Sequence, residues 1–212
     1  MNKDKFIINV GRQLGSGGRS IGKELAKRFG IQYYDKQLLC IAARESGLHE
    51  KFFEEADERA SKTLCGGLFG SRFPFLSDAG MMGGNNFLSN DQLFKIQSDV
   101  MRDLADKDSS LFVGRCADYI LRDYPRCVNV FISASMDDRI KAFQSRNEEV
   151  TEDEARDFLI KADKKRSSYY NYYSNKEWGM SSSYHLCIDS SALGIEKTTS
   201  FIEEFIRIKL AL

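Results

Sequence analysis

Glycine and serine are concentrated at positions 15–18, directly after the apolar run Phe6–Val10 and before a helical pattern. A strand that leads through such a turn into a helix brings unpaired backbone N–H groups and the positive end of the helix dipole to one place. Both attract anionic phosphate, and glycine lets the backbone curl around the anion at positive φ. The pattern predicts a phosphate cradle made by Gly15, Ser16, Gly17, Gly18, Arg19 and Ser20. The alternative is a strand-to-helix turn that binds nothing.

The cradle differs from the P-loop pattern G-x-x-x-x-G-K-[ST] because it contains no lysine. With the usual loop length, Gly18 occupies the lysine position. With a loop one residue longer, Gly18, Arg19 and Ser20 imitate Gly-Lys-Ser, and we adopt this second interpretation. It predicts that Arg19 is the cation that contacts the phosphates and that the hydroxyl of Ser20 is a ligand of Mg²⁺.

Strand and helix patterns alternate along the chain, which is typical of a parallel sheet covered on both faces. Strands are expected at 6–10, 31–35, 111–113, 127–134 and 185–189, and helices at 20–29, 36–46 and 91–105. Asp35 is the last residue of the second expected strand, and Arg115 lies just after the third. Because open α/β sheets bind ligands at the carboxyl ends of their strands, both should meet the glycine loop at one cleft. For Asp35, capping the helix that starts at Lys36 is an equally good interpretation.

Two stretches do not resemble core. Residues 65–90 are rich in Gly, Ser and Asn, so this stretch is expected to be mobile or to fold only against a partner or ligand. Its Phe, Leu and Met residues argue against a pure linker. Residues 139–178 form a basic helical pair that ends in a tyrosine cluster. There Lys161, Lys164 and Arg166 fall within two turns, and Asp157 and Asp163 do not cancel their charge. A solvated surface is the ordinary interpretation, but the spacing also suits a lid that brings cations onto phosphates.

Composition limits the partners. Lys plus Arg and Asp plus Glu both total 31 in 212 residues, so no overall field attracts nucleic acid or a membrane surface. The apolar runs are too short for a membrane span, and the polar start does not resemble a secretory signal, so a cytoplasmic protein is expected. Five widely spaced cysteines favour reduced thiols, and none of the pairs has zinc-ligand spacing. The oligomeric state is left open.

Six blocks together resemble the cytidylate kinase-like family of P-loop nucleoside monophosphate kinases. In order they are RQLGSGGR, YYDKQLL, FVGRCADYIL, FISASMDDRIKAF, KADKKRSSYYNYY and LCIDSSALGIEKT. The resemblance covers nearly the whole chain. The chain differs from true cytidylate kinases at Gly18, where they have the Walker lysine, and at Cys116, where they have an aspartate. Asp118 lies two residues beyond Cys116.

The resemblance implies a three-layer α/β P-loop kinase fold with a five-stranded parallel sheet, formed by a single domain over residues 1–212. It implies an inserted monophosphate-binding subdomain at 36–105 and a helical lid at 139–180. The implied activity is phosphoryl transfer from ATP, with Mg²⁺, to a nucleoside monophosphate, of which CMP or dCMP is the first candidate. Arg19, Arg166 and Asp35 would be catalytic, and Asp35, Arg115, Lys164 and Arg166 would bind the acceptor. The segment 190–193 would contact adenine. The alternatives are a non-catalytic nucleotide-binding or sensor protein and a kinase of another small metabolite.

Overall fold

The computed structural model describes residues 5–35 and 90–212. The chain divides into two compact units, Met1–Asp35 with Arg102–Leu212, and Lys36–Met101. The second unit has nearly the bounds that the sequence assigns to the acceptor-binding insertion, and that role stays a prediction. The helix expected at 36–46 and almost all of the segment 65–90 lie outside the described residues. Helix α5 (Asn90–Lys107) crosses the boundary between the units.

The first unit is built on a five-stranded, entirely parallel sheet in the order β2-β3-β1-β4-β5. The strands are β1 (Ile7–Arg12), β2 (Gln32–Tyr34), β3 (Ser110–Val113), β4 (Cys127–Ser133) and β5 (Leu186–Asp189). Because all five run in one direction, their carboxyl ends share one edge of the sheet. This confirms the predicted α/β architecture.

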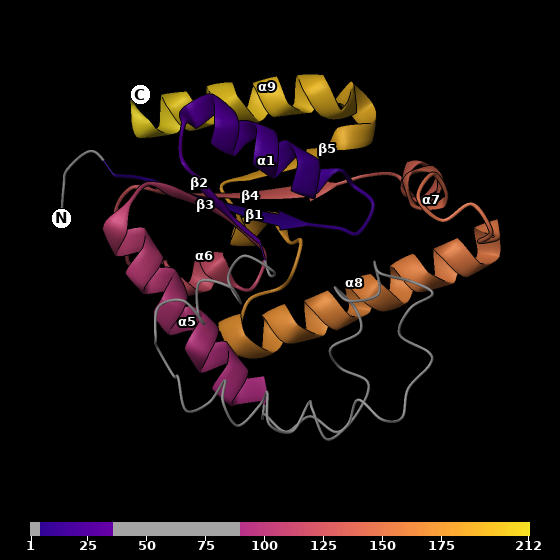
Figure 1. Cartoon of the computed structure of the whole chain (residues 1–212), viewed down its shortest axis with the longest axis horizontal. Coiled ribbons are helices and arrows are strands. Elements are labelled where there is room, and N and C mark those ends of the chain that lie inside the picture. Colours follow the sequence, from indigo (N-terminus) through magenta and orange to yellow (C-terminus); the bar gives the residue numbers. More distant parts are fainter. Residues whose placement is uncertain (1–4, 36–89) are drawn as a thin grey trace, which may run out of the picture. The chain divides into compact units, whose positions relative to one another are not determined.

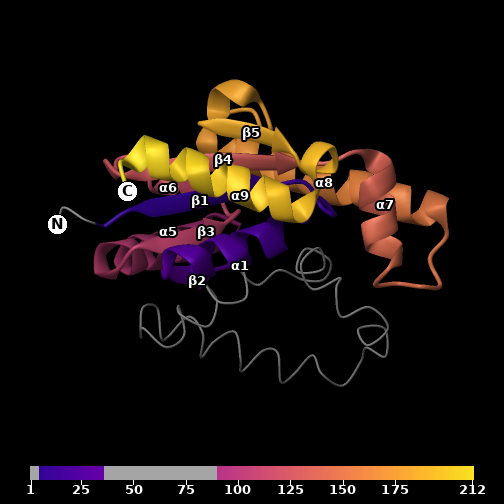
Figure 2. The same ribbon diagram turned by 90° about the horizontal axis from the view of Figure 1, so that it is seen from above.

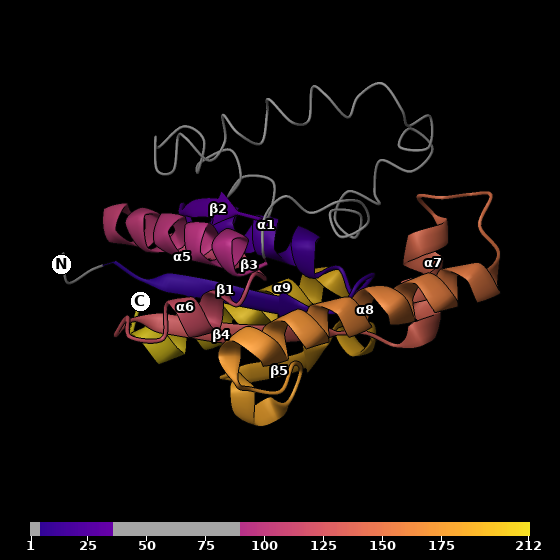
Figure 3. The same ribbon diagram turned by 90° about the horizontal axis from the view of Figure 1, so that it is seen from below.

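Helices cover both faces of this sheet, which makes three layers (Figure 1). On one face lie α1 (Gly18–Phe29) and α9 (Ser190–Leu210), seen side by side in Figure 2. On the other face lie α6 (Ala117–Ile120) and α8 (Glu152–Ser174) (Figure 3). Helix α7 (Met136–Gln144) connects β4 to α8, and a short 3-10 helix (Ser181–Ser183) precedes β5. The predicted tyrosine cluster belongs to the last turns of α8.

Alternation along β1 and β4 assigns their side chains to the two faces. Ile8, Val10, Val128, Val130 and Ile132 belong to the apolar core that includes side chains of α1 and α9. Phe131 points to the other face, where its ring lies 5.1 Å from Trp178 and 5.0 Å from Tyr184. The two-sided burial fixes the register of the sheet and therefore the place where each strand releases the chain.

Helix ends follow local sequence signals. α1 ends at Gly30, which adopts the left-handed conformation and whose N–H bonds back to the last turn. α8 begins with a capping box made by Thr151 and Glu154. α9 contains a kink at Gly194, where φ is 72°. Among the described residues, no helix combines the length and the apolar character needed to cross a membrane.

Candidate functional site

The loop of residues 13–17 joins β1 to α1 and has the geometry of an anion cradle. Gly15 and Gly17 adopt φ angles of 84° and 74°, which other residues rarely reach. Gly17 is the N-cap of α1 and has no side chain with which to bond the N–H groups of the first turn. The first turn of this fully described helix contains no acidic residue. The N–H groups of the first turn and the helix dipole therefore suit an anion, and phosphate binding stays a prediction.

Contacts within the loop and from α9 hold the loop in shape. The hydroxyl of Ser16 donates to the carbonyl of Gln13 at 3.0 Å, and Ser190 Oγ donates to the carbonyl of Ser16 at 2.9 Å. A methyl group at Gly17 would overlap Ile195 of α9. The start of α9, which contains the segment expected to contact adenine, therefore lies against the loop; the adenine contact itself is untested.

An ion pair between buried Arg139 and largely buried Asp163 ties the loop to α7 and α8. Nη2 of Arg139 bonds to Asp163 Oδ2, and Nε of Arg139 donates to the carbonyl of Leu14 at 2.7 Å. The Asp163 carboxylate also accepts the N–H of Leu14 at 2.9 Å. A methyl group at Gly15 would lie 3.0 Å from both Cβ and the carbonyl oxygen of Arg139. Burial raises the pKa of Asp163, although the Leu14 N–H and the charge of Arg139 act in the opposite direction.

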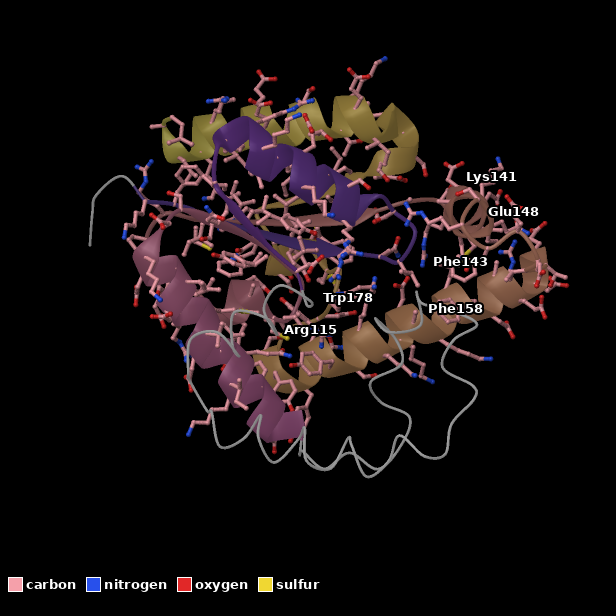
Figure 4. The ribbon with its side chains drawn as sticks, in the orientation of Figure 1. Arg115, Lys141, Phe143, Glu148, Phe158 and Trp178 are labelled. Carbon is pink, nitrogen blue, oxygen red and sulfur yellow. The ribbon has the colours of Figure 1, made fainter. Side chains whose placement is uncertain are left out.

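Arg166 is the predicted lid cation that reaches the loop. Its Nη1 donates to the carbonyl of Arg12 at 3.4 Å and lies 3.9 Å from Asp163 Oδ1. Lys164 is exposed on the same helix, and Lys161 faces Asp157 at 3.8 Å in solvent. Helices α7 and α8 also contact each other through Phe143 and Phe158, whose rings lie 5.0 Å apart (Figure 4).

Arg19 and Asp35 form an ion pair at the end of β2. Nε and Nη2 of Arg19 donate to the same oxygen of Asp35 at 3.0 and 2.7 Å, and the hydroxyl of Tyr33 lies 3.4 Å from that oxygen. The structure thus brings together two predicted site residues, but it gives Arg19 a carboxylate partner. Ser20 is exposed in the first turn of α1, where its hydroxyl is accessible to a cation.

The turn after β3 presents Arg115 from three consecutive left-handed residues. Gly114, Arg115 and Cys116 have φ angles of 76°, 61° and 56°. Side chains other than glycine are strained in this region, and such strain often marks functional positions. The guanidinium of Arg115 lies 5.7 Å from the ring centre of Tyr169 on α8, and Arg115 is labelled in Figure 4. Burial raises the pKa of Tyr169 to about 12, so its hydroxyl is neutral near Arg115 at pH 7.

Asp118 lies inside the protein, on α6. Its Oδ2 accepts a hydrogen bond of 2.7 Å from the hydroxyl of Tyr170 and lies 4.0 Å from Lys176 Nζ. Burial raises the pKa of this carboxyl group above its ordinary value. Neighbouring Cys116 is a buried thiol whose pKa burial raises to about 12. Asp118 is therefore engaged with α8.

The donor set fits ATP phosphates better than a metal held by protein alone. Among the residues described, no group of three or more His, Cys, Asp and Glu side chains could hold a metal ion. Hard Mg²⁺ ions commonly keep several waters and take few protein ligands, so the single hydroxyl of Ser20 beside an anion cradle is compatible with such an ion.

The clamp formed by Arg139 and Asp163 was not found from the sequence. The two residues are 24 positions apart, and Asp163 stands within a run of lysines and arginines, where it resembles one more solvated charge. Its burial depends on α8 packing beside the loop, which local sequence patterns do not encode. One sequence feature could have indicated that Asp163 lies at the loop: it stands one helical turn before Arg166, the predicted lid cation.

The parallel sheet, the glycine loop at the start of α1 and the cation from α8 define an α/β protein of the P-loop kinase class. The model of the cytidylate kinase-like family matches residues 7–192, so the chain belongs to this family. Family membership supports nucleotide-dependent phosphoryl transfer and leaves the acceptor open.

Known structures agree with this fold. An uncharacterized protein from Eubacterium ventriosum shares 27% identity at a TM-score of 0.69, over 95% of this chain and 98% of that one. Shikimate kinase from Bacteroides thetaiotaomicron gives a TM-score of 0.52 at 13% identity, over 98% and 99% of the two chains. Shikimate kinase from Acinetobacter baumannii, in complex with shikimate, gives 0.50 at 14%, over 96% and 94%. No curated protein matches the sequence.

Proposed function

We propose that this protein transfers a phosphoryl group from ATP to a nucleoside monophosphate, with CMP and dCMP as the first candidates. The observation that carries the proposal is the position of Arg166, whose guanidinium donates at 3.4 Å to the carbonyl of Arg12, the residue before the glycine loop. Phosphoryl transfer needs in-line positioning and cations around the shifting charge more than covalent help from the protein. A helix that brings a guanidinium to a phosphate cradle meets this need.

In the proposed function the backbone N–H groups of residues 15–19 bind the ATP phosphates. Bound ATP would supply the transferred phosphoryl group. Mg²⁺, with Ser20 as one ligand, would offset the negative charge on the phosphate oxygens. Arg166 neutralises charge that develops during transfer. No role here requires α8 to move as a lid.

The acceptor would bind at the carboxyl ends of β2 and β3. Arg115 offers a permanent charge for the acceptor phosphate, and Lys164 adds a second, exposed cation. Asp35 orients the acceptor, and Arg19 fixes the Asp35 carboxylate through its two hydrogen bonds. The carboxylate and the cations together match a ligand with hydroxyl groups and a phosphate.

The competing function is nucleotide binding without transfer. Two observations favour it: Gly18 stands at the lysine position of the P-loop pattern, and the Asp163 carboxylate takes the Leu14 N–H, an amide of the loop itself. A binder needs the cradle but does not need Arg166 in the transition state.

A turnover assay separates the two functions. The full chain is incubated with ATP and Mg²⁺ or Mn²⁺ and, in turn, with the monophosphates of cytidine, deoxycytidine, uridine, adenosine and guanosine, and ADP release is followed. We expect transfer to at least one of them. Arg166→Ala should lower kcat by about 100-fold or more and change ATP affinity by less than about threefold, since the contact acts mainly in the transition state.

Arg156→Ala is the matched control, because Arg156 is an arginine of the same helix that pairs with Glu152 at 3.0 Å in solvent. It should keep the parental rate. A parent that binds ATP but transfers to none of these acceptors contradicts the proposal and favours the sensor function or a different metabolite.

A further inference from the structure

The side chain of Arg12, the last residue of β1, follows a path that two glycines leave open. A methyl group at Gly18 would lie 2.5 Å from Cβ and 2.9 Å from Cγ of Arg12. A methyl group at Gly114 would overlap Nη1 of Arg12 and lie 3.1 Å from Cζ. Real side chains essentially never approach so closely, so both positions must lack a Cβ for Arg12 to lie as it does.

This path ends at the edge of the sheet where the candidate site lies. Gly18 begins α1, and Gly114 directly follows β3, with its N–H bonded to the carbonyl of Val10 at 3.0 Å. The aliphatic part of the Arg12 side chain therefore passes the first residue of α1, and the guanidinium lies at Gly114, in the turn that presents Arg115. Ligands of open α/β sheets bind in this region.

The charges at this end of the sheet indicate the kind of ligand that would bind beside Arg12. The N-terminus of a helix carries about half a positive charge, which disfavours a cation beside it. α1 has no acidic residue in its first turn to offset that charge. An anion that binds near the start of α1 is attracted both by the helix dipole and by the charge of Arg12. A phosphate on the loop amides is such an anion.

Arg19 is less suited to this task. Its guanidinium makes two hydrogen bonds to the Asp35 carboxylate, and its side chain is 54% exposed. A phosphate would have to compete with Asp35 for it. Gly18, by contrast, stands at the lysine position of the P-loop pattern, and the Arg12 side chain runs across it.

We infer that Arg12, rather than Arg19, supplies the cation that the missing P-loop lysine would supply to the terminal phosphates of ATP, and that Gly18 and Gly114 are glycines because they make room for it. The inference rests on the proposed function. Its test uses ligand binding, which can be measured whether or not transfer occurs.

The first test is isothermal titration calorimetry of the full chain with ATP and with inorganic tripolyphosphate, each with and without Mg²⁺. Arg12→Ala should weaken both ligands by about 10- to 100-fold, the loss expected for a charge-assisted contact, and Arg12→Lys should recover part of it. Arg19→Ala should change both affinities by less than about threefold. Arg122→Ala is the control for charge, because Arg122 packs on Tyr119 before the start of β4, at the opposite edge of the sheet.

A second test uses Gly114→Ala in a double-mutant cycle. In the parent, the added methyl displaces the Arg12 guanidinium and should weaken ATP binding by about tenfold or more. In the Arg12→Ala background the same change should weaken binding no further, since all three nearest atoms to the methyl belong to Arg12. Strain from the positive φ at Gly114 affects folding in both backgrounds and cancels from this comparison.

The outcomes distinguish the two proposals. Arg12→Ala with parental affinity, or a larger loss in Arg19→Ala, overturns the role of Arg12 even if the parent is an active kinase. Affinity that depends on Arg12 in a parent that transfers nothing supports Arg12 and rejects the kinase function. If Arg12→Ala fails to fold, Arg12→Gln, which removes the charge but keeps most of the side-chain volume, takes its place in both tests. A parent that binds neither ATP nor tripolyphosphate overturns both proposals.

Discussion

At the scale of single residues, buried charges decide how the candidate site is held. Arg139 and Asp163 are both largely removed from solvent, and their other hydrogen bonds go to the two backbone groups of Leu14. Such a pair contributes little net stability compared with apolar packing, but losing one partner leaves an uncompensated buried charge. The pair therefore fixes the position of the loop relative to α7 and α8.

We expect Asp163→Ala to lower the free energy of unfolding by about 3–5 kcal/mol, because Arg139 would stay buried without its counter-charge. Urea denaturation followed by circular dichroism measures the change. The control is Asp157→Ala, whose exposed partner Lys161 lies 3.8 Å away, and it should stay within about 0.5 kcal/mol of the parent. A loss below about 1 kcal/mol at Asp163 would show that Arg139 is solvated in solution.

Asp118 should give stability a distinct dependence on pH. Burial raises its pKa in the folded state, while the Tyr170 hydrogen bond and the Lys176 charge oppose the shift. A carboxyl group with a raised folded pKa stabilises the fold most below its unfolded value, about 3.9, and this contribution is lost as pH rises through the folded pKa. Asp118→Asn does not titrate, so its stability relative to the parent should improve between about pH 4 and pH 7.

Unfolding free energies of the parent and Asp118→Asn across this range measure the effect. Tyr170→Phe is the companion variant. It removes a hydrogen bond that favours the ionised carboxylate, so the free energy of unfolding should fall more with rising pH in this variant than in the parent. A constant difference between Asp118→Asn and the parent, or a drift of opposite sign, would contradict the expectation.

At the scale of elements, α8 acts as a brace across one face of the sheet. It is bonded to the loop through Asp163, to the last residue of β1 through Arg166, and to α6 through Tyr170. These polar contacts make its start and direction important, and the capping box at Thr151 sets that start.

Thr151→Ala should lower the free energy of unfolding by about 1 kcal/mol, because the N–H of Glu154 loses its acceptor and the Glu154 carboxylate loses the bond from Thr151 Oγ1. Ser168→Ala removes another hydroxyl from the same helix at an exposed interior position, and it should be neutral or slightly stabilising, since alanine is the better helix former. Chemical denaturation of the two variants beside the parent checks this. Equal effects would mean that the cap contributes nothing.

At the scale of the whole molecule, attraction of an anionic ligand must be local, since positive and negative side chains are equal in number. Arginines and the dipole of α1 gather at the glycine loop, so binding energy for a nucleotide should come mainly from its phosphates.

ATP at about 100 times its dissociation constant should raise the free energy of unfolding by about 2.7 kcal/mol through mass action. Adenosine at the same concentration should give a much smaller gain, because it lacks the groups that the loop binds. Thermal and urea unfolding with each ligand provide the comparison. Equal stabilisation by adenosine would locate the binding energy at the base and argue against the phosphate cradle.

Local sequence patterns were enough to predict the parallel α/β fold, the glycine loop, and the strand ends at which Asp35 and Arg115 lie. These features follow from local patterns: apolar alternation, glycine at left-handed positions, and helix signals. The tertiary structure alone decided the partners of the charges. Arg19 binds Asp35, Asp163 is buried against Arg139, and Arg12 crosses Gly18 to reach Gly114. Residues far apart in sequence meet only after the strand order is set, and the cost of burying each charge then selects its partner.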